Sequence, residues 1–92
     1  MKIYLEKFGT LLISRQAGRE AFAALQPQLS KISSDETLEI DFVGVITFSP
    51  SWGDEFLSPL AEKYGERLVL IHTANSSVKA TLELLDEIKN RG

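Results

Sequence analysis

The strongest constraint on the fold is a strand-then-helix pattern between residues 38 and 65. Apolar and polar residues alternate over residues 38–43, which predicts a strand with one apolar face. Ser49-Pro50 then combines a favoured N-cap residue with proline at the first helical position, where its missing N–H costs nothing. This predicts a helix to about Tyr64, stopped by Gly65. A strand and a helix joined by a short loop are typical of α/β domains.

The first part of the chain carries two short apolar stretches, residues 2–7 and 10–13, on either side of Gly9. Their spacing predicts two strands that turn near Gly9 as a hairpin. Such a hairpin would make the sheet mixed, since its strands run antiparallel. Ser14 is a good N-cap residue, and the apolar positions after it recur at helical spacing, which predicts a helix to about Ser33.

The last third of the chain repeats the pattern of strand and helix. Residues 67–72 are apolar at their centre, which predicts a central strand buried on both faces. Asn75 predicts the N-cap of a last helix whose apolar stripe includes Val78 and Leu82. The resulting order β-β-α-β-α-β-α predicts a single α/β domain over residues 1–92, with a mixed, mostly parallel sheet.

Composition excludes several classes of function. The 92 residues include no cysteine and one histidine, which excludes a disulfide scaffold, a thiolate site and a multi-histidine metal site. The net charge of −3 argues against a protein that binds nucleic acid through its phosphates. No stretch has the length of a signal-peptide core or of a membrane span. We therefore expect a cytoplasmic protein with no metal, no cofactor, no nucleic acid and no membrane partner.

Few residues could carry catalysis. His72 is expected at the end of a strand, where α/β proteins bind ligands, but no nucleophile motif accompanies it. Asp41 lies within a strand and is expected to accept hydrogen bonds from the loop that follows. We expect both residues to be structural and the protein not to be an enzyme. The alternative, an enzyme that uses this pair, requires the two side chains within hydrogen-bond reach.

Charged residues cluster near the starts of two expected helices. Arg15 and Arg19 are one helical turn apart. A cation at a helix start opposes the helix dipole, so an anion or acidic partner at these arginines is one hypothesis and a solvated face is the other. Asp54 and Glu55 are expected in the first turn of the next helix, where acidic residues complement the dipole.

The start of the helix after Ser49 is the most informative segment. Ser49, Ser51 and the N–H groups of a helix start form a natural position for an anion or a phosphoserine. Gly53 falls at the centre of the buried face, where a missing side chain lets helix and sheet approach closely. Trp52 falls at the margin of that face, and two hypotheses stay open: an anchor for a partner, or a ring that only packs over the sheet edge.

Three motifs resemble the STAS-like family of bacterial domains of unknown function: Asp41-Phe42-x-Gly44-Val45, Ser49-x-Ser51-Trp52-Gly53-Asp54-Glu55 and Arg15-x-x-Gly18-Arg19. That family is similar to the STAS domains of sulfate transporters and of anti-sigma factor antagonists. The resemblance covers nearly the whole chain. It implies a STAS-like fold and a regulatory role in the bacterial cytoplasm.

The resemblance also bears on phosphorylation. Anti-sigma factor antagonists carry Asp-Ser-Ser-Gly at this helix start, and a serine kinase of the histidine-kinase-like ATPase fold phosphorylates the first serine. Aligned through Asp41 and Gly44, this chain has Pro50 at the acceptor position, and only Ser51 matches a family serine. Ser51 is therefore the candidate phosphorylation site, although regulation by phosphorylation does not simply carry over.

The leading hypothesis is a non-enzymatic regulatory module that docks on a histidine-kinase-like ATPase or kinase through residues 47–56. The second is a small anion or ligand sensor that uses the same helix start. The expected partner-binding residues are Ser49, Ser51, Trp52, Asp54, Glu55, Arg15 and Arg19. Asp41, Gly44 and Gly53 are expected to shape the site. The identity of the partner and the oligomeric state stay open.

Overall fold

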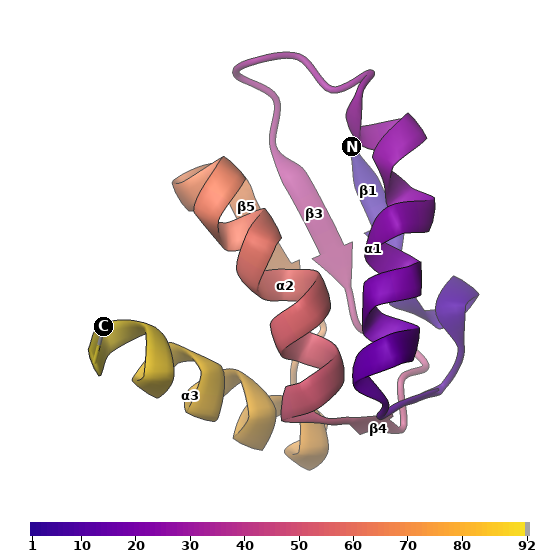
Figure 1. Ribbon diagram of the computed structural model, residues 1–92, viewed down its shortest axis with the longest axis vertical. Coiled ribbons are helices and arrows are strands. Elements are labelled where there is room, and N and C mark those ends of the chain that lie inside the picture. Colours follow the sequence, from indigo (N-terminus) through magenta and orange to yellow (C-terminus); the bar gives the residue numbers. More distant parts are fainter. Residues whose placement is uncertain (92) are drawn as a thin grey trace.

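A computed structural model describes residues 1–91, with side chains as far as Glu87 (Figure 1). The elements in chain order are β1 (Lys2–Tyr4), the 3-10 turn η1 (Leu5–Phe8), β2 (Leu11–Leu12), α1 (Arg15–Leu29), β3 (Leu38–Asp41), β4 (Thr47–Phe48), α2 (Pro50–Tyr64), the 3-10 turn η2 (Gly65–Arg67), β5 (Leu68–Ile71) and α3 (Ser76–Arg91). The predicted α/β class is confirmed. The predicted order is compatible with this arrangement, to which the structure adds the short strand β4.

The strands pair only in parallel within the described residues. β1, β3 and β5 form one sheet in the order β1-β3-β5, while β2 and β4 form a separate two-stranded sheet. The predicted opening hairpin is therefore wrong, and so is the mixed sheet that depended on it. The chain winds into η1 after Tyr4 and buries Leu5 completely, so β2 leaves the first sheet and pairs with β4 instead.

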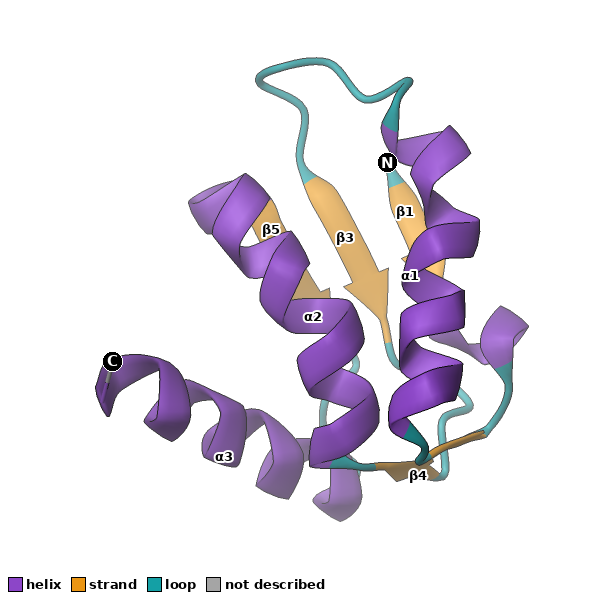
Figure 2. Cartoon of the chain, in the orientation of Figure 1, coloured by secondary structure: helices purple, strands orange, loops and turns teal. Residues whose placement is uncertain are grey.

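The helices cover the three-stranded sheet on one side. α1 and α2 lie side by side in front of the sheet, and α3 projects away from them (Figures 1 and 2). β3 is the central strand, and β5, which was predicted to be central, lies at the edge. Val69 of β5 is 37% exposed and Tyr4 of β1 is 48% exposed, since α1 and α2 cover the other face of the sheet. The burial on both faces predicted for β5 is therefore wrong.

Side-chain caps begin all three helices where the sequence predicts them. Ser14 Oγ accepts a hydrogen bond from the Ala17 N–H at 3.0 Å, and Ser49 Oγ accepts one from the Trp52 N–H. Asn75 Oδ1 does the same for α3. α1 ends at Leu29, earlier than predicted, because the chain then tightens into i→i−3 hydrogen bonds that no longer continue an α-helix.

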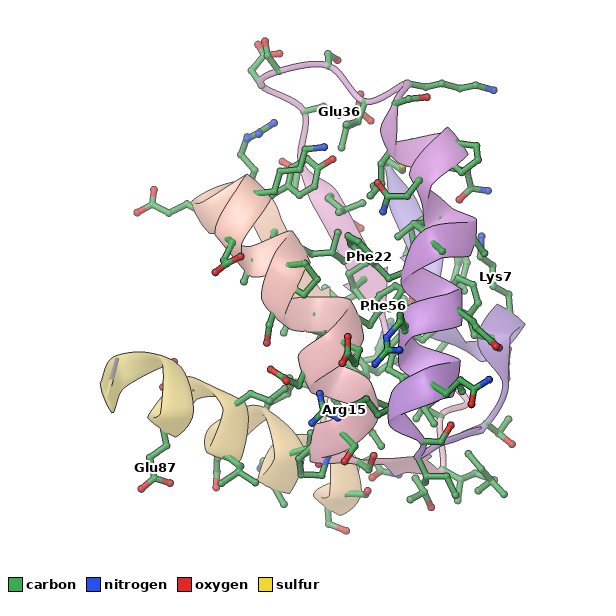
Figure 3. The ribbon with its side chains drawn as sticks, viewed as in Figure 1. Lys7, Arg15, Phe22, Glu36, Phe56 and Glu87 are labelled. Carbon is green, nitrogen blue, oxygen red and sulfur yellow. The ribbon has the colours of Figure 1, made fainter. Side chains whose placement is uncertain are left out.

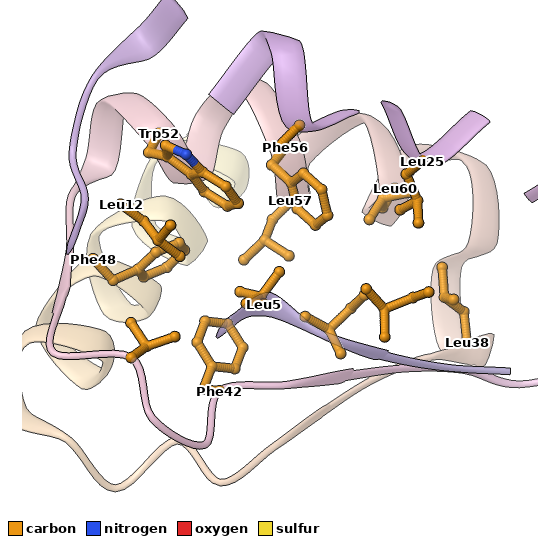
Figure 4. Packing of buried hydrophobic residues seen from close by; sticks show 14 of the residues in the cluster. Leu5, Leu12, Leu25, Leu38, Phe42, Phe48, Trp52, Phe56, Leu57 and Leu60 are labelled. Carbon is orange, nitrogen blue, oxygen red and sulfur yellow. The ribbon is translucent and has the colours of Figure 1, made fainter. Parts of the chain in front are cut away.

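The core lies between the two helices and the sheet. Figure 4 shows its aromatic part, where Trp52 and Phe56 of α2 pack above Phe42 and Phe48. The predicted helical phase of α2 is confirmed, because Gly53, Phe56, Leu57, Leu60 and Tyr64 are all buried. In α3, Val78 is fully buried and Leu82 and Leu85 pack partly against the core. The sequence also places Ile88 at the edge of this apolar stripe and Lys89 and Arg91 near the end of the helix, and these three side chains lie outside the described ones. None of the helices over residues 1–91 has the length and apolar character to cross a membrane.

Candidate functional site

The carboxyl ends of the strands and the starts of the three helices lie at the same end of the molecule (Figure 1). This end is where α/β proteins bind their ligands. Asn75 ties the start of α3 to the loop before β4, since its Nδ2 donates to the carbonyls of Val45 and Ile46 at 3.2 and 3.1 Å. The predicted site residues Asp41, Ser49 and Ser51 are all found in this region.

At the start of α2 most backbone N–H groups already have partners. Ser49 Oγ accepts from the Trp52 N–H and donates to the Ile13 carbonyl at 2.6 Å, and the Gly53 N–H donates to the Ser49 carbonyl. Pro50 has no N–H to offer. Within the described structure, Ser51 is therefore the residue of this first turn whose N–H is left without a protein partner. That leaves little with which to hold a free anion here.

The charged residues predicted to meet a partner contact one another. Arg15 Nη1 lies 3.1 Å from Asp54 Oδ2 and 2.9 Å from Glu55 Oε1, and Arg19 Nη2 lies 3.5 Å from the same Glu55 oxygen. Arg15, labelled in Figure 3, joins α1 to α2 in this way. Both acids lie in the second turn of α2, so their expected place in the first turn is wrong.

These ion pairs also favour the charged form of Glu55. The hydrogen bond from Arg15 is the main cause that lowers the pKa of the Glu55 carboxyl, with burial opposing it and Arg19 adding to it. Exposed pairs of this kind stabilise a fold by about 0–1 kcal/mol each. Their clearer role is to fix α1 against α2. Arg15 and Arg19 are 50% and 66% exposed, as the solvated-face hypothesis expects, and they also pair with acids of the same chain.

Trp52 is part of the core. Its side chain is 1% exposed, with ring centroids 4.8 Å from Phe56, 5.8 Å from Phe48 and 6.4 Å from Phe8 (Figure 4). The prediction of a half-exposed anchor is therefore wrong, and the packing hypothesis is the correct one. The margin of the α2 face is buried because Phe8 of η1 and the neighbouring helix α1 cover it.

Asp41 and His72 meet at the ends of β3 and β5. Asp41 is 1% exposed, and its Oδ1 accepts from the Val43 N–H at 2.9 Å and lies 2.8 Å from His72 Nδ1. Lys2 Nζ lies 3.6 Å from the other carboxylate oxygen. The predicted loop-fixing role of Asp41 is confirmed. Asp41 and His72 also lie within the hydrogen-bond distance that the enzyme alternative requires. His72 has a left-handed φ of 58°, and its side chain is largely exposed.

The surroundings of Asp41 lower the pKa of its carboxyl. Burial alone would raise this pKa, but the Val43 N–H, the His72 ring and the Lys2 charge together outweigh burial and hold it below its usual range. A carboxylate of this kind stabilises the folded state above its unfolded-state pKa of about 3.9. The contribution is lost as the pH falls through the folded-state pKa.

Replacing Asp41 with Asn is expected to lower the free energy of unfolding at neutral pH, because Lys2 and His72 lose their common partner. The difference in free energy of unfolding between wild type and Asp41→Asn should become smaller below about pH 4, where protonation of Asp41 removes the same contribution from wild type. Urea denaturation at several pH values measures the gap. Asp35→Asn, in an exposed loop, controls for the loss of one charge. A gap that stays constant with pH would show that Asp41 does not act through its charge.

Gly44 shapes the loop between β3 and β4, as predicted. Its φ of +82° lies in the left-handed region, and a side chain there would overlap the carboxylate of Glu6. Glycine accepts this conformation without a Cβ penalty. The loop can therefore pass directly beneath η1 and continue into β4.

An apolar patch beside this loop was missed by the sequence analysis. Leu11, Ile13 and Ile46, which we call the apolar patch, are 60%, 53% and 60% exposed. Leu11 pairs with Thr47, and the Ile46 N–H donates to the Thr10 carbonyl, so the two segments that carry these residues run side by side. The signal was present in residues 10–13, since an alternating strand that buries Leu12 must expose its neighbours.

No family model, no curated protein and no solved structure matches this chain. Among the described residues, no group of three or more histidine, aspartate or glutamate side chains is arranged to hold a metal ion.

Proposed function

We propose that the chain is a non-enzymatic interaction module, of the STAS-like kind that its motifs resemble, which docks on a histidine-kinase-like ATPase. The docking surface consists of the accessible residues within 47–56, which do not include the buried Trp52, together with the apolar patch. The observation that carries the proposal is the exposure of the apolar patch directly beside the start of α2, where Ser49 hydrogen-bonds to Ile13. Contiguous exposed apolar residues with a polar rim are typical of protein-binding surfaces.

The polar rim of this surface is already rigid. Ser49 is fixed by two hydrogen bonds, and Arg15 holds Asp54 and Glu55 in place. A rigid surface loses little conformational entropy when a partner binds, which favours affinity. Trp52 supports the surface from below and is not part of it.

Ser51 is the serine that the proposal assigns to phosphorylation. The Ser49 hydroxyl is committed to the cap and to Ile13, whereas Ser51 is partly exposed at the second helical position. A phosphate there would gain from the helix dipole and would present about two negative charges to the partner.

The two alternatives have less support. A sensor at the start of α2 would need free hydrogen-bond donors. The Trp52 N–H is engaged by the serine cap, Pro50 has no N–H, and the Arg15 guanidinium is paired with Asp54 and Glu55. An enzyme would need a substrate site around His72 and Asp41. The pocket beside Tyr64 and the pocket beside Leu82 are lined by neither residue. The Asp41–His72 contact is explained by the need to pair a buried carboxylate.

The test is binding of purified histidine-kinase-like ATPase domains from the source organism, measured by isothermal titration calorimetry. Wild type is expected to bind one of them. The double variant Leu11→Ser, Ile46→Ser should bind at least tenfold more weakly, which corresponds to about 1.4 kcal/mol. After incubation with ATP, mass spectrometry is expected to find any phosphate at Ser51.

Leu84→Ser is the matched control, because Leu84 is an exposed leucine on α3, away from the proposed surface. It should bind as wild type does. The proposal is wrong if none of the ATPase domains binds, or if the patch variant and the control bind equally. Phosphate found at Ser14 or Ser76 alone would remove the link to anti-sigma factor antagonists.

A further inference from the structure

A pocket of about 290 Å³ lies at the other end of α2, between the last turns of α1 and α2 and the loop after α1. α2 has 15 residues, so at 1.5 Å per residue Tyr64 lies about 21 Å from the start of α2, beyond the last of the proposed docking residues. Its volume is near the lower limit of small-molecule sites, which is about 300 Å³. Leu29 and Ile32 supply apolar wall, and Tyr64, Lys63, Arg67 and Ser34 supply polar groups.

Tyr64 has the only buried side-chain polar atom in the described structure that lacks a hydrogen-bond partner. Its side chain is 5% exposed, and its hydroxyl makes no hydrogen bond. Leaving such a group unpaired typically costs about 1–3 kcal/mol. Tyr64 itself lines the pocket, but its hydroxyl lies beneath the surface, so a molecule bound there pairs with the hydroxyl after a small shift of the neighbouring side chains.

Two cations flank the same tyrosine. Lys63 Nζ lies 5.5 Å from the centre of the Tyr64 ring, and the guanidinium carbon of Arg67 lies 5.0 Å from it. None of the described ion pairs involves either residue. Arg67 makes two long hydrogen bonds of 3.4 Å, to the carbonyls of Ser33 and Glu36, which leave most of its N–H groups free. No carboxylate lines the pocket, and Glu36, which accepts hydrogen bonds from Ser33 of the lining, is paired with the Met1 ammonium, so Lys63 and Arg67 are the charged side chains of the lining.

The ends of α1 and α2 bring negative helix dipoles toward this pocket, which disfavours an anion. At α1 that effect is reduced, because its last carbonyls are occupied. The Ser30, Lys31 and Ile32 N–H groups bind the carbonyls of Gln26, Gln28 and Leu29, and Ser30 Oγ donates to that of Pro27. Two full positive charges then outweigh the partial charges of the helix ends.

We propose that this pocket binds a small organic oxyanion, a phosphate monoester or a carboxylate. Its oxygen atoms accept hydrogen bonds from the Tyr64 hydroxyl, Lys63 and Arg67, and its apolar part packs against Leu29 and Ile32. The proposal does not depend on the docking function, because the two sites share no residue.

Isothermal titration calorimetry with phenyl phosphate, benzoate and inorganic phosphate tests the site. Phenyl phosphate or benzoate is expected to bind in a 1:1 ratio, and whichever binds more tightly identifies the preferred oxyanion. Tyr64→Phe should weaken binding about tenfold, as expected for a hydrogen bond to a charged group, while its urea midpoint stays equal to or above that of wild type. Lys63→Gln should also weaken binding, whereas Lys79→Gln on α3 should not.

Three results would overturn the proposal. One is no binding of any of the three probes up to about 10 mM. Another is a Tyr64→Phe variant that binds as wild type does, since this would leave the unpaired hydroxyl without a role in the site. The third is inorganic phosphate binding as tightly as phenyl phosphate, which would contradict an organic ligand held by the apolar wall.

Discussion

Replacing Trp52 with alanine is expected to cost about 3–5 kcal/mol of folding free energy, the range found for large aromatic residues in protein cores. The side chain is 1% exposed and stacks on Phe56 with a centroid separation of 4.8 Å. Its removal leaves a cavity that Phe48 and Phe8 cannot fill without moving. The free energy of unfolding of a domain is about 5–15 kcal/mol, so Trp52→Ala should lose a large fraction of it.

Urea denaturation followed by far-UV circular dichroism measures this loss without needing the tryptophan itself. Trp52→Phe is the matched control and should lose much less, because most of the ring volume stays. In wild type, the fluorescence of Trp52 should be blue-shifted before any partner is added. A Trp52→Ala midpoint close to that of wild type would contradict the position of Trp52 in the core.

Gly18 is the second residue whose substitution should have a large effect. A Cβ at Gly18 would lie 2.6 Å from the Trp52 carbonyl oxygen, a backbone atom, so α1 and α2 would have to separate. At Gly53 the nearest atoms are the ends of the Leu85 and Phe48 side chains, both at 2.9 Å. Side-chain ends can shift more easily than backbone can, so the two glycines should respond differently.

Gly18→Ala is therefore expected to be destabilising, although glycine to alanine inside a helix normally gains up to about 1 kcal/mol. Gly53→Ala should cost less than Gly18→Ala, and Gly53→Leu should reach the 1–3 kcal/mol typical of overpacking. Urea midpoints of the three variants give this order. If Gly18→Ala is as stable as wild type or more so, the close approach of the two helices is wrong.

Local signals predicted the helices well. Ser14, Ser49 and Asn75 act as N-caps through contacts with residues two or three positions along the chain, so the sequence alone contains both partners. The prediction that Gly53 lies on the buried face of α2 was also correct. Periodicity reports one direction of burial, toward the sheet, and that direction was right.

Contacts between distant segments could not be predicted in this way. Trp52 was assigned to the margin of a helix because the pattern does not reveal that Phe8 covers it from η1. The acids that pair with Arg15 could not be identified from the sequence, because they are 39 and 40 positions away, on a helix whose proximity only the fold reveals. Asp41 and His72 were both singled out, but their hydrogen bond depends on β5 lying beside β3.

Hydrogen-exchange mass spectrometry of the chain, with and without a saturating histidine-kinase-like ATPase domain, tests the docking proposal most directly. The proposal predicts slower exchange on binding in residues 10–14 and 46–56, which contain the apolar patch and the start of α2. Exchange in α3 and in β5 should not change. Protection confined to α3 or to the open face of the sheet around Tyr4 and Val69, or no protection anywhere, would contradict it.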